Sequence, residues 1–332
     1  MQILRSNRMP LVEQIVRNIS MEIDKGAYGT GFRLLSINDF SDQYVVARDT
    51  VEKAYKELKR QGYITSAMGK GYFVVGKKEE KLKVLFIFNK ISSYKKNIYY
   101  SFLDTLGDGG KVDLQVHHYS ATLFKEIIEQ NLGKYHYYVV MPHFLNGSNH
   151  SEYLDVLKKI PADQLMLLDK NLPGFSHHMS VYQDFGQDIF DALDSGKHWL
   201  RMYEHISFIF SEATKHPTDI LDGARTFCNC NNLSLKITYH VDEVQLVKKT
   251  VYILTSEEDL AWLVKKVRNS QFVPGKDIGI ISFNETIFKE LMGISVLTTD
   301  FEQMGRTAAE LILARKHLQI KNPFRLIKRN SL

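Results

Sequence analysis

The stretch VARDTVEKAYKELKRQGYITSAMGKGYFV, residues 46–74, decides how the first part of the chain folds. Its first half is highly charged, but Val51, Tyr55 and Leu58 recur at the spacing of one buried helix face. Gly62 is a natural helix stop, and the two short β-favouring runs that follow are joined by a Gly-Lys-Gly turn. The stretch therefore predicts a long helix followed by a two-stranded hairpin with a basic tip.

Two further helices are predicted upstream of this stretch. Residues 11–23 carry an apolar side chain at every fourth position and predict a helix that Pro10 opens. Ser36 can cap a second, short helix over residues 37–43. Three helices followed by a hairpin form a winged helix-turn-helix, whose later helix enters the major groove of DNA. We therefore expect residues 1–76 to be an α+β DNA-binding domain.

Charge is unevenly distributed along the chain. The 332 residues carry 43 Lys and Arg against 38 Asp and Glu, a net charge of +5. Most of this excess lies in residues 1–81, which predicts a nucleic-acid-binding end joined to a nearly neutral body. We find neither an apolar run of membrane-spanning length nor the apolar core of a signal peptide, so we expect a cytoplasmic protein without membrane contact.

The body of the chain shows a different pattern. Residues 77–82 form a charged run without apolar periodicity, which we interpret as a linker to a second domain over residues 83–332. In that domain short apolar strands alternate with amphipathic helices, which is typical of α/β folds with parallel sheets. The predicted strands are 84–88, 114–117, 137–141, 165–168, 180–182, 205–210, 234–238, 250–254 and 278–283.

No motif in the body indicates catalysis. Residues 107–111 are rich in glycine but lack the spacing and the hydroxyl of a phosphate-binding Walker loop, so they predict a turn between a helix and a strand. The adjacent histidines at 117–118 and 177–178 would point to opposite faces of a strand and could not chelate one ion. Cys228 and Cys230 are expected to be reduced thiols. We therefore expect no metal, no cofactor, no catalytic residue and no enzymatic activity.

The first segment resembles the DNA-binding domain of the GntR family of bacterial regulators. The matching residues keep one register: Gly31, Leu34, Ser36, Phe40, Val46, Arg48, Thr50, Val51, Ala54, Tyr55, Leu58, Gly62, Tyr63, Ile64 and Gly69–Val74. The sequence departs from the family at Leu35, Asn38, Ala47, Asp49 and Glu52. The resemblance implies double-stranded DNA as a partner. The residues expected to contact it are Ser36, Asn38, Arg48, Asp49, Thr50, Lys53, Gly69 and Lys70.

The body is similar to the sugar-sensing domain of LacI/GalR regulators, itself similar to periplasmic sugar-binding proteins. The clearest matches are Val273–Glu285, Ser295–Thr299 and Met304–Ala308, with weaker ones at Leu167–Gly174 and Val181–Asp184. This resemblance implies two α/β lobes with a ligand in the cleft between them. A GntR head on such a body resembles the arabinose repressor type of the GntR family. It implies a monosaccharide effector such as a pentose or a deoxyhexose.

The same resemblance implies which residues line the cleft. Asn284 stands where the family has an aspartate that holds sugar hydroxyls, and Asp184 matches another acidic pocket position. The loops after the first strand and after residues 137–141 should reach the cleft by topology. Ile220 stands where the family has an arginine, and Lys215 or His216 is expected to replace it. The expected ligand-binding residues are Ser92, Tyr94, His143, Asp184, Lys215 and Asn284.

These expectations describe a ligand-responsive regulator. A winged helix reads one half-site, so a homodimer on a pseudo-palindromic operator is expected, with its dimer surface on the sensing domain. We expect a repressor that a sugar releases from DNA. Two other classes fit the same organisation: an α/β enzyme that carries a DNA-binding head would show turnover, and a ligand-independent scaffold would bind no small molecule.

Overall fold

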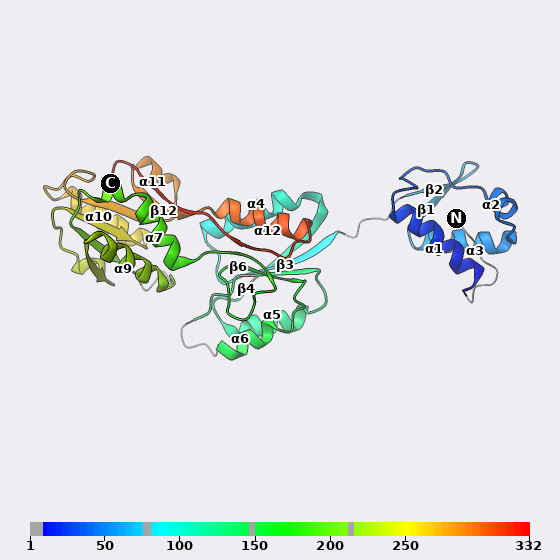
Figure 1. Cartoon of the computed structure of the whole chain (residues 1–332), viewed down its shortest axis with the longest axis horizontal. Helices are drawn as coiled ribbons and strands as arrows, with labels where there is room; N and C mark the ends of the chain where they lie inside the picture. Colours follow the sequence, from blue (N-terminus) through cyan, green and yellow to red (C-terminus); the bar gives the residue numbers. More distant parts are fainter. Residues whose placement is uncertain (1–8, 76–80, 146–149, 212–215) are drawn as a thin grey trace. The chain divides into compact units, whose positions relative to one another are not determined.

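The structure, a computed structural model, describes residues 9–75, 81–145, 150–211 and 216–332. The chain forms two compact units, Met1–Glu80 and Lys81–Leu332 (Figure 1). Most of the predicted linker, residues 77–80 of 77–82, lies outside the described residues. Within the described ranges no helix has the length and apolar character needed to cross a membrane.

Unit 1 has the predicted three helices and hairpin. Strands β1 (Ile64–Ala67) and β2 (Gly71–Val74) pair antiparallel. The helices are α1 (Leu11–Asp24), α2 (Ile37–Tyr44) and α3 (Arg48–Arg60). Helix α3 begins at Arg48, two residues into the stretch 46–74, and Val45 adopts a left-handed conformation with φ of 53° that ends α2. The chain can therefore turn between α2 and α3, as a helix-turn-helix requires.

The core of unit 1 includes apolar residues that the helical periodicity selected. Ile15 and Ile19 of α1 pack with Val51 and Leu58 of α3, and all four are almost fully buried. Each such side chain stabilises the fold by about 1.5–3 kcal/mol relative to an exposed one. The hydroxyl of the buried Tyr55 also donates a hydrogen bond to the Leu35 carbonyl at 3.0 Å, which fixes α3 against the segment before α2.

Unit 2 contains two six-stranded sheets, each the centre of one lobe. Lobe 1 has the order β13-β7-β6-β5-β3-β4, and all its strands are parallel. Its strands are β3 (Leu82–Phe88), β4 (Gly110–Val116), β5 (Tyr137–Val140), β6 (Leu165–Asp169), β7 (Met179–Tyr182) and β13 (Gln319–Lys321). Helices α4 (Ser93–Leu106) and α12 (Phe301–Leu313) cover one face, and α5 (Ala121–Asn131) and α6 (His150–Leu157) cover the other (Figure 1).

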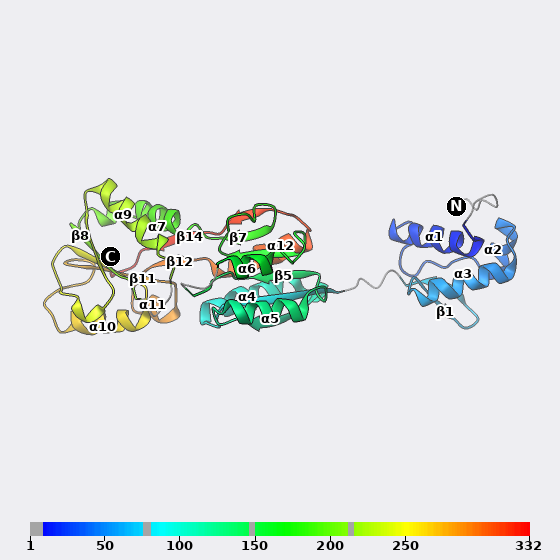
Figure 2. The same cartoon turned by 90° about the horizontal axis from the view of Figure 1, so that it is seen from below.

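Lobe 2 has the order β14-β12-β11-β10-β8-β9, with β14 antiparallel to β12. Its strands are β8 (His205–Ile209), β9 (Ser234–Thr238), β10 (Thr250–Leu254), β11 (Gly279–Phe283), β12 (Ser295–Thr299) and β14 (Phe324–Ile327). Its helices are α7 (Phe185–Ser195), α8 (Lys197–Leu200), α9 (Asp219–Asn231), α10 (Glu257–Arg268) and α11 (Ile287–Leu291). Figure 2 shows α7 and α9 on one face of this sheet, with α10 and α11 on the opposite face.

The chain passes between the lobes three times. The crossings follow β7, β12 and β13, at Tyr182–Phe185, Thr299–Phe301 and Lys321–Phe324. Each lobe therefore contains segments that are far apart in the sequence. This double-lobed arrangement places the carboxyl ends of both sets of parallel strands at the junction, where α/β proteins bind ligands.

All nine predicted strands are present, and the fold classes predicted for both parts of the chain are confirmed. The turn predicted at residues 107–111 is also confirmed, as a short 3-10 turn over Gly107–Gly109 that leads into β4. Three further strands, β12, β13 and β14, were not among those predicted. Strand β13 has only three residues with a mostly exposed pattern, so its side chains carry no alternating hydrophobic signal.

Candidate functional site

The predicted DNA-contacting residues of the helices lie on α2 and at the start of α3. Ser36 caps α2 by accepting a hydrogen bond from the Asp39 amide at 3.1 Å, so its hydroxyl has a structural role. Asn38 is exposed on α2, and Arg48 and Asp49 are exposed in the first turn of α3. Lys53 is exposed one turn further along α3, and Thr50 is half-buried between them.

The hairpin tip presents the remaining predicted residues. Gly69 and Gly71 have φ of 71° and 103°, a conformation that L side chains rarely adopt, so this turn needs glycine at both positions. The Lys70 amide closes the turn on the Ala67 carbonyl at 3.0 Å, and the Lys70 side chain is exposed. The tip can therefore bring one cation and bare backbone close to a phosphate.

A cavity of about 250 Å³ lies between the two lobes of unit 2. It is smaller than the ~300–1,000 Å³ pockets that hold drug-sized ligands. Apolar and aromatic side chains make up part of its wall: Tyr94, Tyr119, Phe185, Ile189, Pro217, Ile220, Phe283, Phe301 and Phe324. The polar residues of the wall come from both lobes: Asn89, Lys90, Ser92, Ser93, Lys95, His143, Asp169, Gln183, Asp188, His216, Thr255, Ser256, Glu257, Asn284 and Thr299.

A chain of hydrogen bonds runs along the cavity to two of the crossings. His143 Nε2 lies 2.8 Å from Asp169 Oδ2, and the Gln183 amide donates to Asp169 Oδ1 at 2.6 Å. The Thr299 hydroxyl donates to Gln183 Oε1 at 2.8 Å. Gln183 and Thr299 lie in two of the crossings, so these hydrogen bonds connect the cavity wall to the segments that join the lobes.

The charge states of Asp169 and His143 follow from their burial and from their hydrogen-bond partners. Burial opposes ionisation of Asp169, but the His143 hydrogen bond, the charges of His143 and Lys95 and the Gln183 amide lower its pKa to about 2. Burial lowers the pKa of His143, although Asp169 opposes this shift. Asp169 is therefore an ionised acceptor, and His143 a neutral imidazole, near pH 7.

Two further titratable side chains in the cavity are buried. Burial lowers the pKa of Lys95 to about 8, and its ammonium donates to Asn89 Oδ1. Burial and the charge of Lys90 lower the pKa of His216 to about 4, so its imidazole is neutral near pH 7. The cavity thus offers a strong donor from lobe 1 and a neutral ring from lobe 2.

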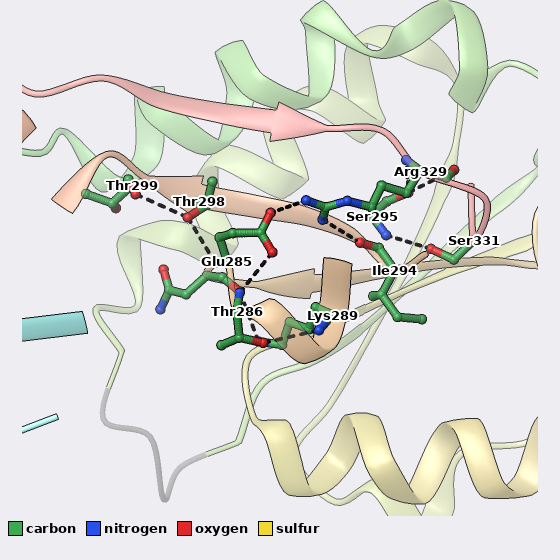
Figure 3. Close-up of polar contacts among 10 residues, drawn as sticks. Glu285, Thr286, Lys289, Ile294, Ser295, Thr298, Thr299, Arg329 and Ser331 are labelled. Carbon is green, nitrogen blue, oxygen red and sulfur yellow. Dashed lines mark hydrogen bonds and ion pairs between the residues drawn. The ribbon is translucent and has the colours of Figure 1, made fainter. Parts of the chain in front are cut away.

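Asn284 lies directly after β11, where the structure holds it in an unusual conformation. Its φ is 62°, in the left-handed region that non-glycine residues enter mainly at turns and functional sites. The buried Lys289 ammonium supports the loop by donating to the Phe283 carbonyl at 2.7 Å and to the Asn284 carbonyl at 3.0 Å. Figure 3 shows Lys289 beneath this loop and Glu285 directed to Arg329, with which it forms an ion pair.

One contact joins the lobes directly at the cavity wall. The Tyr94 hydroxyl of α4 donates to Glu257 Oε1 at the start of α10, at 2.8 Å. The Tyr94 ring also stacks on Phe301, with 5.3 Å between the ring centroids. Since Tyr94 belongs to lobe 1 and Glu257 to lobe 2, this hydrogen bond can form only when the lobes are close together.

The structure brings four of the six predicted ligand-binding residues together. Ser92, Tyr94, His143 and Asn284 all line the cavity. Asp184 does not, because its exposed carboxylate caps α7 by accepting from the Gln187 amide at 3.3 Å. Lys215 lies outside the described residues, whereas the alternative, His216, lines the cavity. Four further residues of the wall were not predicted from the sequence: Lys95, Asp169, Gln183 and Asp188.

Comparison with known proteins agrees with this division of the chain. Residues 11–74 match the profile of the gntR family, described as bacterial regulatory proteins. The HTH-type transcriptional repressor YtrA of Bacillus subtilis (strain 168) is 28% identical over 95 residues, which are 29% of this chain and 70% of that protein.

Two solved structures share the fold of unit 2. The trehalose repressor from Escherichia coli has a TM-score of 0.60 at 15% identity and covers 75% of this chain and 100% of its own. A periplasmic binding protein/LacI transcriptional regulator from Alkaliphilus metalliredigens QYMF, complexed with D-xylulofuranose, has a TM-score of 0.56 at 12% identity. It covers 75% of this chain and 98% of its own.

The chain therefore combines a head similar to that of bacterial transcriptional regulators with a body that has the two-lobed fold of the trehalose repressor and of a periplasmic binding protein/LacI transcriptional regulator. The head, residues 11–74, is a helix-turn-helix domain of the gntR family of bacterial regulatory proteins. Both resemblances seen in the sequence are confirmed at this level.

Proposed function

We propose that this protein binds DNA through unit 1 and that a monosaccharide or related sugar in the cavity of unit 2 controls this binding. The observation that carries the proposal is the cavity itself, because both lobes contribute buried hydrogen-bonding groups and aromatic rings to it. A ligand that contacts both walls favours the closed arrangement of the lobes over an open one.

The chemistry of the wall suits a sugar. A sugar ring has hydroxyls that both donate and accept hydrogen bonds, and flat apolar faces that stack on aromatic rings. Asp169 and the Asn284 amide can bind hydroxyls, and Tyr94 and Phe301 offer stacked rings. The structural neighbour complexed with D-xylulofuranose holds a sugar in the same fold, which supports this assignment.

In the proposed mechanism, sugar binding changes the affinity for DNA, and DNA binding changes the affinity for the sugar by the same factor. We expect the sugar to release the protein from DNA, which would make the protein a repressor. We also expect the protein to be cytoplasmic and to have no catalytic turnover. The hydrogen bonds from Asp169 through Gln183 to Thr299 connect the ligand to the crossings that would rotate.

The first test is a thermal-shift screen of the full chain against neutral monosaccharides, followed by DNA-release assays with each hit. A sugar at 100 times its Kd should add about 2.7 kcal/mol to the stability of the protein. The bound sugar should be recovered unchanged. Asn284→Ala should abolish the shift, while Asp184→Asn, outside the cavity, should keep it. A protein that no small molecule stabilises would contradict the proposal and support a ligand-independent scaffold.

We also propose a homodimer that uses the outer face of α11. Ile287, Phe288 and Leu291 are 75%, 78% and 77% exposed, an apolar group that a soluble monomer rarely leaves in water. Two copies that bury this face would present two heads to a pseudo-palindromic operator.

Light scattering can test the dimer. The wild-type protein should have twice the chain mass, and the double variant Phe288→Glu, Leu291→Glu should be a monomer, because two carboxylates would be buried in its interface. Tyr239→Glu, another exposed aromatic residue of lobe 2, is the matched control and should remain dimeric. A double variant that stays dimeric would place the interface elsewhere.

A further inference from the structure

Asp188 is a carboxylate of the cavity wall to which no role has been assigned so far. It lies in the first turn of α7, is 3% exposed and lines the cavity. Its Oδ1 lies 2.9 Å from the Lys321 ammonium of β13. This ion pair holds the carboxylate in place from one side, next to the third crossing between the lobes.

The other oxygen of this carboxylate has no donor. Among the residues that the structure describes, Asp188 Oδ2 is fully buried and accepts no hydrogen bond. A buried acceptor without a donor is costly, and such groups in folded proteins are normally satisfied by a protein group, a water or a ligand. Since Asp188 also lines the cavity, a hydroxyl of a ligand bound there can supply this donor.

Among the described residues, the carboxylates of the wall outnumber its ammonium groups, which are those of Lys90 and Lys95. The described wall contains the carboxylates of Asp169, Asp188 and Glu257 and no arginine. Lys321 and Lys289 lie 2.9 Å and 3.3 Å from the carboxylates of Asp188 and Glu257, respectively. Phosphates are usually bound by arginine forks or by cations that are free to pair with them.

The two histidines of the wall do not change this balance. Burial lowers the pKa of both His143 and His216, so neither imidazole adds a positive charge near pH 7. The two ammonium groups of the wall, on Lys90 and Lys95, both come from lobe 1, and the ionised Asp169 lies close enough to influence the titration of Lys95. A phosphate or carboxylate in this space would face carboxylates from both lobes.

We propose that Asp188 accepts a hydrogen bond from a hydroxyl of the effector and makes the cavity selective for an uncharged polyhydroxylated ligand over its phosphorylated or carboxylated forms. This inference rests on the proposed function, since it specifies the effector of the same cavity. It adds Asp188 to the ligand-binding residues and gives it the role of excluding anions.

The test compares each neutral sugar with its charged relatives on the full chain. Suitable sets are glucose, glucuronate and glucose 6-phosphate, galactose and galacturonate, and ribose and ribose 5-phosphate, measured by isothermal titration. The neutral member of a binding set should bind at least 100-fold more tightly than its charged relatives. Asp188→Asn keeps the size of the side chain but removes its charge and turns one oxygen into a donor. This variant should bind neutral sugars at least 10-fold more weakly than the wild type. Its ratio of affinities for neutral over anionic sugars should also be smaller.

Asp184→Asn is the matched control, because Asp184 begins the same helix but does not line the cavity. It should change affinity less than twofold, and both variants should melt as single transitions without ligand. Tighter binding of a phosphorylated or carboxylated sugar, or unchanged affinity in Asp188→Asn, would overturn the inference while leaving a sugar-responsive regulator. Binding of no member of any set would remove the proposed function and this inference together.

Discussion

Replacing Arg48 by alanine is expected to weaken operator binding at least 10-fold. Arg48 is exposed in the first turn of α3, the helix that a winged helix-turn-helix inserts into the major groove. Loss of an arginine that contacts a guanine costs about 1–3 kcal/mol and relaxes the base preference at that position. Fluorescence anisotropy with a duplex selected from random sequences, at fixed salt, measures the change.

Arg60→Ala provides the matched control for this measurement. Arg60 lies at the opposite end of α3 and pairs with Glu57 at 2.6 Å, both on an exposed surface. Its removal should change DNA affinity by less than twofold at the same salt concentration. If Arg48→Ala and Arg60→Ala have equal effects, α3 does not dock by its first turn, and the orientation of the head on DNA must be different.

Replacing Asp169 by alanine is expected to abolish detectable sugar binding and to destabilise unit 2. The change removes the acceptor for His143 and for Gln183, at 2.8 Å and 2.6 Å, and the negative charge that acts to raise the pKa of Lys95. A buried donor without its partner costs about 1–3 kcal/mol, so the two together should cost on the order of 3 kcal/mol. Urea denaturation of the full chain measures the loss.

Asp222→Ala is the matched control, because it removes an aspartate that lies on the exposed surface and not in the cavity. Asp222 forms an exposed pair with Arg225 at 2.7 Å, and such surface pairs contribute about 0–1 kcal/mol. Its removal should leave both sugar binding and the urea midpoint almost unchanged. Wild-type sugar affinity in Asp169→Ala would show that the ligand does not depend on the His143–Asp169–Gln183 chain.

Most of the fold could be predicted because its signals are local. The fourth-residue spacing of apolar side chains in α1 and the capping serine of α2 lie within single elements. The strands of the two lobes are short apolar runs between helices, and nine of them were found in this way. Strands β13 and β14 were missed because their places depend on pairing with strands far away in the chain, which no local pattern records.

The candidate site was predicted in part, and the reasons differ from residue to residue. Asn284 and His143 follow buried strands, and this position brings side chains to the cleft in α/β folds. Asp169 ends β6 and could have been found by the same signal. Asp184 precedes a helix, where an aspartate often caps, and that role turns its side chain away from the cavity.

Lys95 and Asp188 could not have been selected from the sequence. Both lie in the first turn of amphipathic helices, where charged residues are usually solvated. In the structure both are buried, because the two lobes meet over them. Only the approach of segments distant in sequence distinguishes them from ordinary surface charges.

The three crossings also set an order for folding during synthesis. Unit 1 is contiguous and has its own core, so it can fold once about 80 residues have left the ribosome. Lobe 1 cannot complete its sheet until β13 emerges at Gln319–Lys321, nor can lobe 2 until β14 emerges at Phe324–Ile327. The nascent chain therefore has a finished unit 1 well before either lobe of unit 2 is complete.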